Sequence, residues 1–213
     1  MEIKEEEITK IIEFLYKYNY SEYERFGVLL NIFDYTANES DICSQIRAYL
    51  GLDKGCKDAY MGYLQILKKY FTLDRDIVEV GAGHFPIMSH YIDNEQIKIK
   101  KGTITAYDPK LVVSSLGNIS LQKKEFTLNT PIKNSSLLFG ISPCQATDII
   151  VKKSCMEETE FFISMCFCPP YNGDYRPLYQ FAKRISEPRS EIIVENLPKE
   201  YGELGSVIIK KKY

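Results

Sequence analysis

The stretch Asp76-Ile77-Val78-Glu79-Val80-Gly81-Ala82-Gly83-His84-Phe85-Pro86 decides the fold of this 213-residue chain. The apolar, β-branched residues before Gly81 predict a buried strand. Gly81 and Gly83 predict a tight turn, because glycine adopts unusual backbone angles and lets a ligand approach the main chain closely. Pro86 suits the first position of a helix, where its missing N–H costs nothing. We therefore expect a strand, a glycine turn and a helix whose free N–H groups can bind an anionic group.

The chain from residue 72 to 213 repeats this alternation of strand and helix. Predicted strands cover residues 76–80, 103–107, 123–127, 136–141, 160–167, 190–195 and 206–211, and predicted helices cover 86–93, 110–116 and 144–155. Alternating strands and helices predict a mostly parallel sheet wrapped by helices. Only a turn-rich loop separates the last two strands, which predicts an antiparallel hairpin. The fold class is thus α/β, with a Rossmann-like sheet of seven strands.

Residues 1–70 are predicted to form a separate helical region of about four helices. Ile8, Ile11, Ile12 and Leu15 line one face of the first helix. The second helix opens with the capping box Ser21-Glu22-Tyr23-Glu24, and the third and fourth cover about residues 40–50 and 53–69. These helices are rich in tyrosine, which is consistent either with an ordinary core or with the lining of a substrate pocket.

An acidic residue, Asp108, ends the second predicted strand. An acid at that position can hydrogen-bond a ribose diol, and ligands of open α/β sheets bind beyond the carboxyl ends of the strands. Asp108 and the turn at Gly81 both lie at such ends. The two motifs together therefore predict a binding site for a ribose-containing ligand.

In these features the chain resembles the class I S-adenosylmethionine (SAM) methyltransferases. That family carries an acid two positions before a Gly-x-Gly loop, as Glu79 does here, and an acid after the second strand that holds the adenosine ribose, as Asp108 does. Its sheet also ends in an antiparallel hairpin. The resemblance implies a SAM-dependent transferase whose cofactor-binding residues are Glu79, Gly81, Ala82, Gly83, His84, Asp108 and Pro109.

The loop departs from the family because His84-Phe85-Pro86 replaces its usual third glycine. The pattern Gly-x-Gly-x-x-Pro is similar to that of nicotianamine synthases, which also place helices ahead of a SAM-binding domain, and of short archaeal Rossmann proteins. A nicotinamide or flavin site is disfavoured, since the dinucleotide fingerprint requires glycine where Pro86 stands.

The resemblance places the methyl acceptor at the end of the fourth strand, next to Ser142, Pro143 and Cys144, with Tyr171 a further candidate. The segment Cys168-Pro169-Pro170-Tyr171 resembles the Asp/Asn-Pro-Pro-Tyr motif of amino-methylating nucleic-acid enzymes. It lacks the leading Asp or Asn and follows the fifth strand, so we interpret it as a loop at the mouth of the site. No catalytic base is predicted.

The formal net charge of −2 gives no strong basic excess for holding a nucleic acid, and it favours a small-molecule acceptor. Two alternatives remain: a non-catalytic Rossmann-like binding or partner protein with a degenerate site, and a nucleic-acid methyltransferase. The latter requires the strand count to be wrong by one strand–helix unit.

Metal binding and membrane insertion are not predicted. The six cysteines contain no Cys-x-x-Cys pair, and His84 and His90 are spaced too far apart to share one helix face. The acidic N-terminus lacks the layout of a signal peptide, and no apolar run approaches the roughly 20 residues of a membrane span. We expect a cytoplasmic protein.

Overall fold

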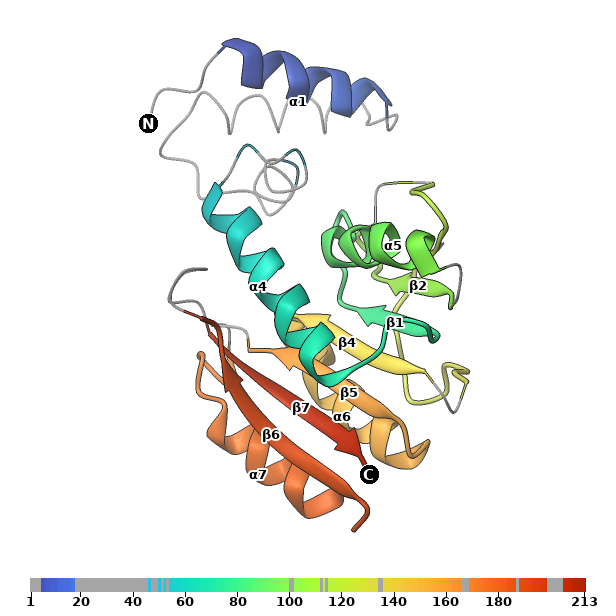
Figure 1. The fold of residues 1–213 in the computed structure, drawn as a ribbon, viewed down its shortest axis with the longest axis vertical. Coiled ribbons are helices and arrows are strands. Elements are labelled where there is room, and N and C mark those ends of the chain that lie inside the picture. The colour runs from blue at the N-terminus through green and yellow to red at the C-terminus, as the bar shows by residue number, and fades with distance from the viewer. Residues whose placement is uncertain are drawn as a thin grey trace.

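The computed structural model contains one seven-stranded sheet, shown in Figure 1. It describes residues 5–17, 46, 50, 52, 54–99, 102–111, 113, 115–133, 136–165, 169–186, 188–198 and 205–213. The strands are β1 (Ile77–Val80), β2 (Ile104–Tyr107), β3 (Ile119–Gln122), β4 (Leu137–Ile141), β5 (Glu160–Ser164), β6 (Ser190–Asn196) and β7 (Ser206–Lys212). Their order is β3-β2-β1-β4-β5-β7-β6.

The first five strands are parallel, and β7 lies antiparallel between β5 and β6. This arrangement confirms the predicted α/β sheet and its antiparallel C-terminal hairpin. The first strand turns from β1 to β2 on one side and to β4 on the other. Ligands of open α/β sheets bind at such a point of reversal, beyond the carboxyl ends of the strands.

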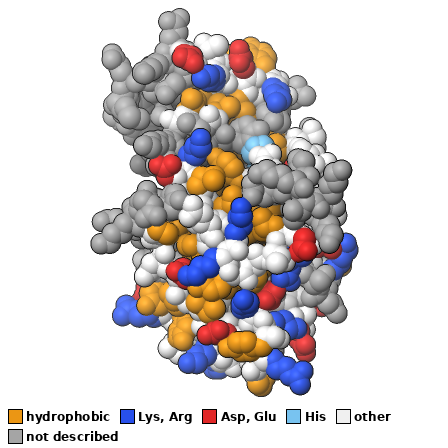
Figure 2. All heavy atoms as spheres, viewed as in Figure 1, with side chains coloured by type: hydrophobic (Ala, Val, Ile, Leu, Met, Phe, Trp, Pro, Cys, Tyr) orange, Lys and Arg blue, Asp and Glu red, His pale blue; other side chains and the backbone are white. Residues whose placement is uncertain are grey.

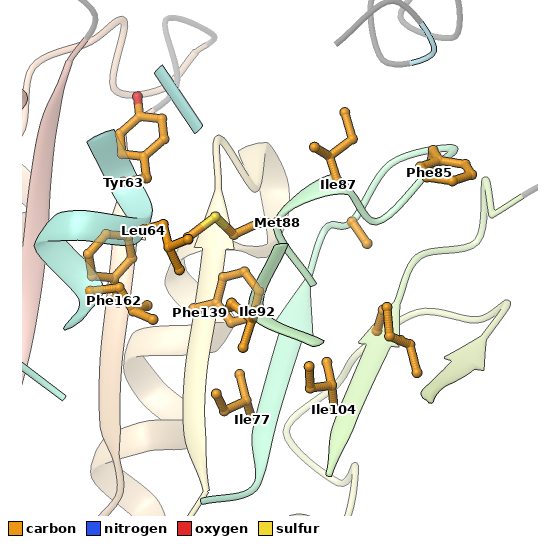
Figure 3. Close-up of a cluster of buried hydrophobic side chains, with 14 of the residues drawn as sticks. Tyr63, Leu64, Ile77, Phe85, Ile87, Met88, Ile92, Ile104, Phe139 and Phe162 are labelled. Carbon is orange, nitrogen blue, oxygen red and sulfur yellow. The ribbon is translucent and has the colours of Figure 1, made fainter. Parts of the chain in front are cut away.

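Two layers of helices cover the sheet. The helices are α1 (Glu5–Lys17), α4 (Lys54–Tyr70), α5 (Ile87–Ile99), α6 (Thr147–Met156) and α7 (Arg176–Ile185), with a 3-10 turn η1 (Cys144–Ala146) before α6. Apolar residues of α4 and α5 share one core with Ile77, Phe139 and Phe162, several of which Figure 3 shows. Residues of α6 and α7 share the other core with Val78 and Phe161. Neighbouring strand residues thus point to opposite faces.

The N-terminal predictions are tested only where the structure describes the chain. The first predicted helix corresponds to α1 and the fourth to α4, and Ile11 and Leu15 of α1 are buried as expected. The second predicted helix lies outside the described residues, as does most of the third. Helix α4 packs directly on the sheet, so its apolar face forms part of the same core as the strands.

Three predictions for the α/β part were wrong. The third strand is β3 at Ile119–Gln122, not residues 123–127, and the described residues of 110–116 contain no helix. Helix α7 was not predicted at all. Pro86 stands just before α5, which begins at Ile87, so it occupies the position preceding the first helical residue.

Charges of both signs are mixed on the face shown in Figure 2, where Lys and Arg side chains alternate with Asp and Glu around apolar residues. Within the described residues, no helix has the length and apolar character needed to cross a membrane.

Candidate functional site

The glycine loop, residues 81–86, connects β1 to α5 and is fastened to the end of β2. The backbone amides of Gly81 and Ala82 both donate to the carbonyl oxygen of Tyr107, at 3.0 and 3.3 Å. Gly81 and Gly83 have φ angles of 74° and 69°. Only glycine adopts such angles without strain, so the two glycines are required by the shape of the loop.

Asp108 follows β2 directly and connects to this loop. One carboxylate oxygen accepts the Gly83 amide at 2.9 Å, and the other accepts the Lys110 amide at 2.7 Å. The two amides fix the plane of the carboxylate. Each oxygen still has a second lone pair, so the group can accept further hydrogen bonds from a ligand. The structure therefore brings together the two motifs that the sequence placed at neighbouring strand ends.

Glu79 lies two residues before the loop and is almost completely buried, with 4% of its surface exposed. Its Oε2 accepts the backbone amide of Ser89 at 3.2 Å. Ser89 is the third residue of α5, where the amide has no partner within the helix. Burial raises the pKa of Glu79 to about 7, and the negative charge of Asp108 adds to the rise, although the contacts with Ser89 oppose it.

The remaining predicted cofactor residues surround this centre. Ala82 is buried, His84 is half-buried within the loop, and Pro109 is exposed in the turn after Asp108. His90, which was predicted to lie on the helix surface, is half-buried on α5. Burial lowers the pKa of its imidazole.

The loop after β4 packs on the glycine loop through Pro143, which is buried. A Cβ atom added to Gly81 would lie 2.9 Å from the Cα of Pro143, and one added to Gly140 would lie 2.8 Å from the Pro143 ring. Ser142 and Cys144, on either side, are exposed and have positive φ angles of 51° and 47°. Pro143 thus forms part of the floor of the site, while its two neighbours face solvent.

Tyr171 is connected to the same end of the sheet by α6. Its hydroxyl donates to Asp148, which lies in the first turn of the helix that follows Cys144. Burial and the carboxylate of Asp148 together raise the pKa of the Tyr171 hydroxyl. Tyr171 follows β5, and β4 ends at Ile141, so the strand count needed for the nucleic-acid motif is not met.

Sequence reasoning missed two partners in this site. Asp148 was not singled out, although an acid in the first turn of a predicted helix favours a role at that end. Ser89 carries no sequence signal for its contact with Glu79, because it acts through its backbone amide. Among the described residues there is no cluster of three or more His, Cys, Asp or Glu side chains that could hold a metal ion.

No family model matches this chain, and no curated protein matches its sequence. Its structure is similar to that of magnesium protoporphyrin IX methyltransferase from Synechocystis PCC 6803 with bound SAM, with a TM-score of 0.52 and 8% identity; the match covers 100% of this chain and 99% of that one. It is also similar to a candidate S-adenosyl-L-methionine-dependent methyltransferase from Methanococcus maripaludis, with a TM-score of 0.52, 13% identity and coverage of 83% and 96%. At these identities the similarity shows the fold, and the chain has the fold of the class I SAM-dependent methyltransferases.

Proposed function

We propose that the protein binds SAM beyond the carboxyl ends of β1 and β2 and transfers its methyl group to a small molecule. The observation that carries the proposal is the hydrogen bond from the Gly83 amide to Asp108, which joins the glycine loop to the acid after β2. It occurs on a sheet with the methyltransferase strand order. Nicotianamine synthases and the short archaeal Rossmann proteins share the Gly-x-Gly-x-x-Pro pattern of this loop.

The residues present fit such a cofactor. A carboxylate held by two amides retains acceptor capacity for a ribose diol. The loop at Gly81 has no side chain between its backbone and Pro143, so a ligand can approach the main chain closely. Ala82, His84 and Pro109 complete the proposed surface around the cofactor. Glu79 supports this surface from below by binding the first turn of α5.

When bound, SAM supplies a methyl group already activated by its sulfonium centre. The work left to the protein is to align the acceptor and to exclude water. We assign the acceptor side to Ser142, Pro143 and Cys144, which follow β4, and to Tyr171. The low net charge and the mixed surface charges support a small-molecule acceptor.

A non-catalytic binding protein is the second candidate. No histidine lies among the residues assigned to the acceptor side, and the one nearby carboxylate found there, Asp148, already accepts the Tyr171 hydroxyl. A site without a free proton acceptor can bind SAM without turning it over. Methyl transfer to any small-molecule acceptor would exclude this alternative.

Isothermal titration with SAM and S-adenosylhomocysteine (SAH), with NAD as the comparison ligand, tests the cofactor proposal. We expect both sulfur compounds to bind and Asp108→Ala to weaken binding by about tenfold to a hundredfold, because charge-assisted hydrogen bonds are lost.

Asp76→Ala is the matched control. Asp76 stands before β1 at the opposite end of the sheet, and its carboxylate also accepts an amide of a neighbouring segment, that of Thr103 at 3.0 Å. Its loss should leave the affinity for SAH unchanged. Failure of the unaltered protein to bind either sulfur compound would overturn the proposal.

A further inference from the structure

The N-terminal helix α1 contacts the glycine loop through an aromatic pair. Phe14 of α1 and Phe85 of the loop have ring centroids 5.2 Å apart, with an angle of 58° between the ring planes. Both rings are buried, with 3% and 1% of their surfaces exposed. Figure 3 shows Phe85 in the loop, apart from the cluster of Met88, Ile92 and Phe139 above the sheet. The partner that covers Phe85 therefore includes α1.

The backbone around Phe85 belongs to the proposed cofactor site. Two residues earlier, the Gly83 amide donates to Asp108, and the carbonyl oxygen of Phe85 accepts the amide of Ile87 at 2.9 Å. Phe85 is thus fixed between the amide that orients Asp108 and the first residue of α5. A shift of its ring would move both, since the connecting segment is only a few residues long.

Aromatic pairs at this separation contribute stabilisation beyond the area they bury. Without α1, the Phe85 ring would be exposed to water on the side that Phe14 covers, and the loop would gain other arrangements. Only the arrangement with Gly83 on Asp108 suits the proposed ligand. A ligand that binds one loop arrangement stabilises everything that favours that arrangement.

We propose that α1, through Phe14, is a positioning element of the cofactor site, so that docking of α1 and binding of the cofactor favour each other. This inference rests on the proposed function, because it concerns the same site. Coupling of this kind is reciprocal: whatever factor the docked helix adds to cofactor affinity, the cofactor adds to helix docking.

The first test compares two phenylalanines of the core. Phe14→Ala should weaken SAH binding by about tenfold or more, within the range usual for coupled sites. Phe161→Ala is the matched control, since Phe161 is fully buried in the core on the other face of the sheet. It should lower the melting temperature and leave SAH affinity unchanged. If either alanine variant does not fold, Phe14→Leu and Phe161→Leu replace the pair, with a smaller expected difference in affinity.

The second test uses the unaltered protein. Addition of SAH should slow hydrogen exchange of the α1 amides, residues 5–17, although none of them belongs to the proposed ligand contacts. The same addition to Phe14→Ala should leave exchange in α1 unchanged.

The outcomes separate the two proposals. If the unaltered protein does not bind SAH, the proposed function fails. If it binds SAH, but Phe14→Ala and Phe161→Ala bind it equally well and α1 exchanges at the same rate with and without SAH, the role of α1 is refuted and the cofactor site stands.

Discussion

The buried carboxyl of Glu79 should make the protein less stable as the pH rises, and Glu79→Gln should remove that effect. Glu79 is 4% exposed and has one hydrogen bond to a neutral donor, the amide of Ser89. No cation compensates its charge among the contacts described. Burying an ionised carboxylate under these conditions is unfavourable, which is why burial raises its pKa.

The magnitude follows from the pKa of Glu79, which moves from an ordinary value of 4.5 to about 7. Below the lower value both the folded and the unfolded states hold the proton, and the group contributes nothing. Between the two values the unfolded state has lost the proton and the folded state retains it, so stability falls as the pH rises. Above the higher value the full penalty of about 3 kcal/mol applies.

Urea unfolding of the unaltered protein and of Glu79→Gln, at about pH 4.5 and about pH 8.5, measures this penalty. The difference in unfolding free energy between the two proteins should change by about 3 kcal/mol across this range, in favour of the glutamine variant at the higher pH. Any fixed cost of fitting the amide group cancels, because it is the same at both pH values.

Parallel pH profiles for the two proteins would refute the reasoning, since they would mean that Glu79 ionises alike in the folded and unfolded states. Asp108→Ala offers a check on the cause. It removes the negative charge that adds to the rise in the Glu79 pKa, so the pH-dependent difference should become smaller in that background.

Two further predictions concern the floor and the mouth of the site. Gly140→Ala should lower the unfolding free energy measured in urea by about 1–3 kcal/mol, because its Cβ would lie 2.8 Å from the Pro143 ring and 2.9 Å from the Val80 carbonyl oxygen; an unchanged value would mean that the loop after β4 yields freely. Tyr171→Phe should lower the thermal stability by about 1–2 kcal/mol through loss of the hydrogen bond to Asp148, whereas no loss would mean that water replaces the hydroxyl at no cost.

The strand–turn–helix centred on Gly81 was predictable because its signals are local. A buried apolar strand, two glycines and a proline restrict the backbone over eleven consecutive residues. The antiparallel hairpin was predictable for a similar reason, since no helix fits between its strands. In both places the sequence pattern and the tertiary structure require the same conformation.

The segment between β2 and β3 was predicted wrongly because a distant residue determines it. Asp93 of α5 accepts the amide of Asn118 at 3.2 Å, which fixes the turn before β3. The edge strand Ile119–Gln122 is only four residues long, and its alternation is too short to outweigh the neighbouring run that was predicted instead. Helix α7 has a clearer signal, with Pro177 at its start and Leu178 and Ala182 one turn apart, both fully buried.

The contacts within the candidate site depended on pairings that sequence spacing does not give. The glycine loop and Asp108 could be placed at neighbouring strand ends by the general behaviour of α/β sheets. The contact of Pro143 with Gly81 could not, because it depends on how closely the ends of β1 and β4 approach. The contact of Phe14 with Phe85 joins residues 71 positions apart, a separation over which no periodic pattern extends.

The close fit of Pro143 against Gly81 and Gly140 has a consequence for how a ligand reaches the site. Where two backbones touch with no side chain between them, neither can swing aside without first separating from the other. The base of the site is then a fixed support, and the opening that admits and releases a ligand must form elsewhere, among the elements that lie above it. Substitutions that change residence time should therefore be sought in α1 and in the segment containing Tyr171, and not in the glycines themselves.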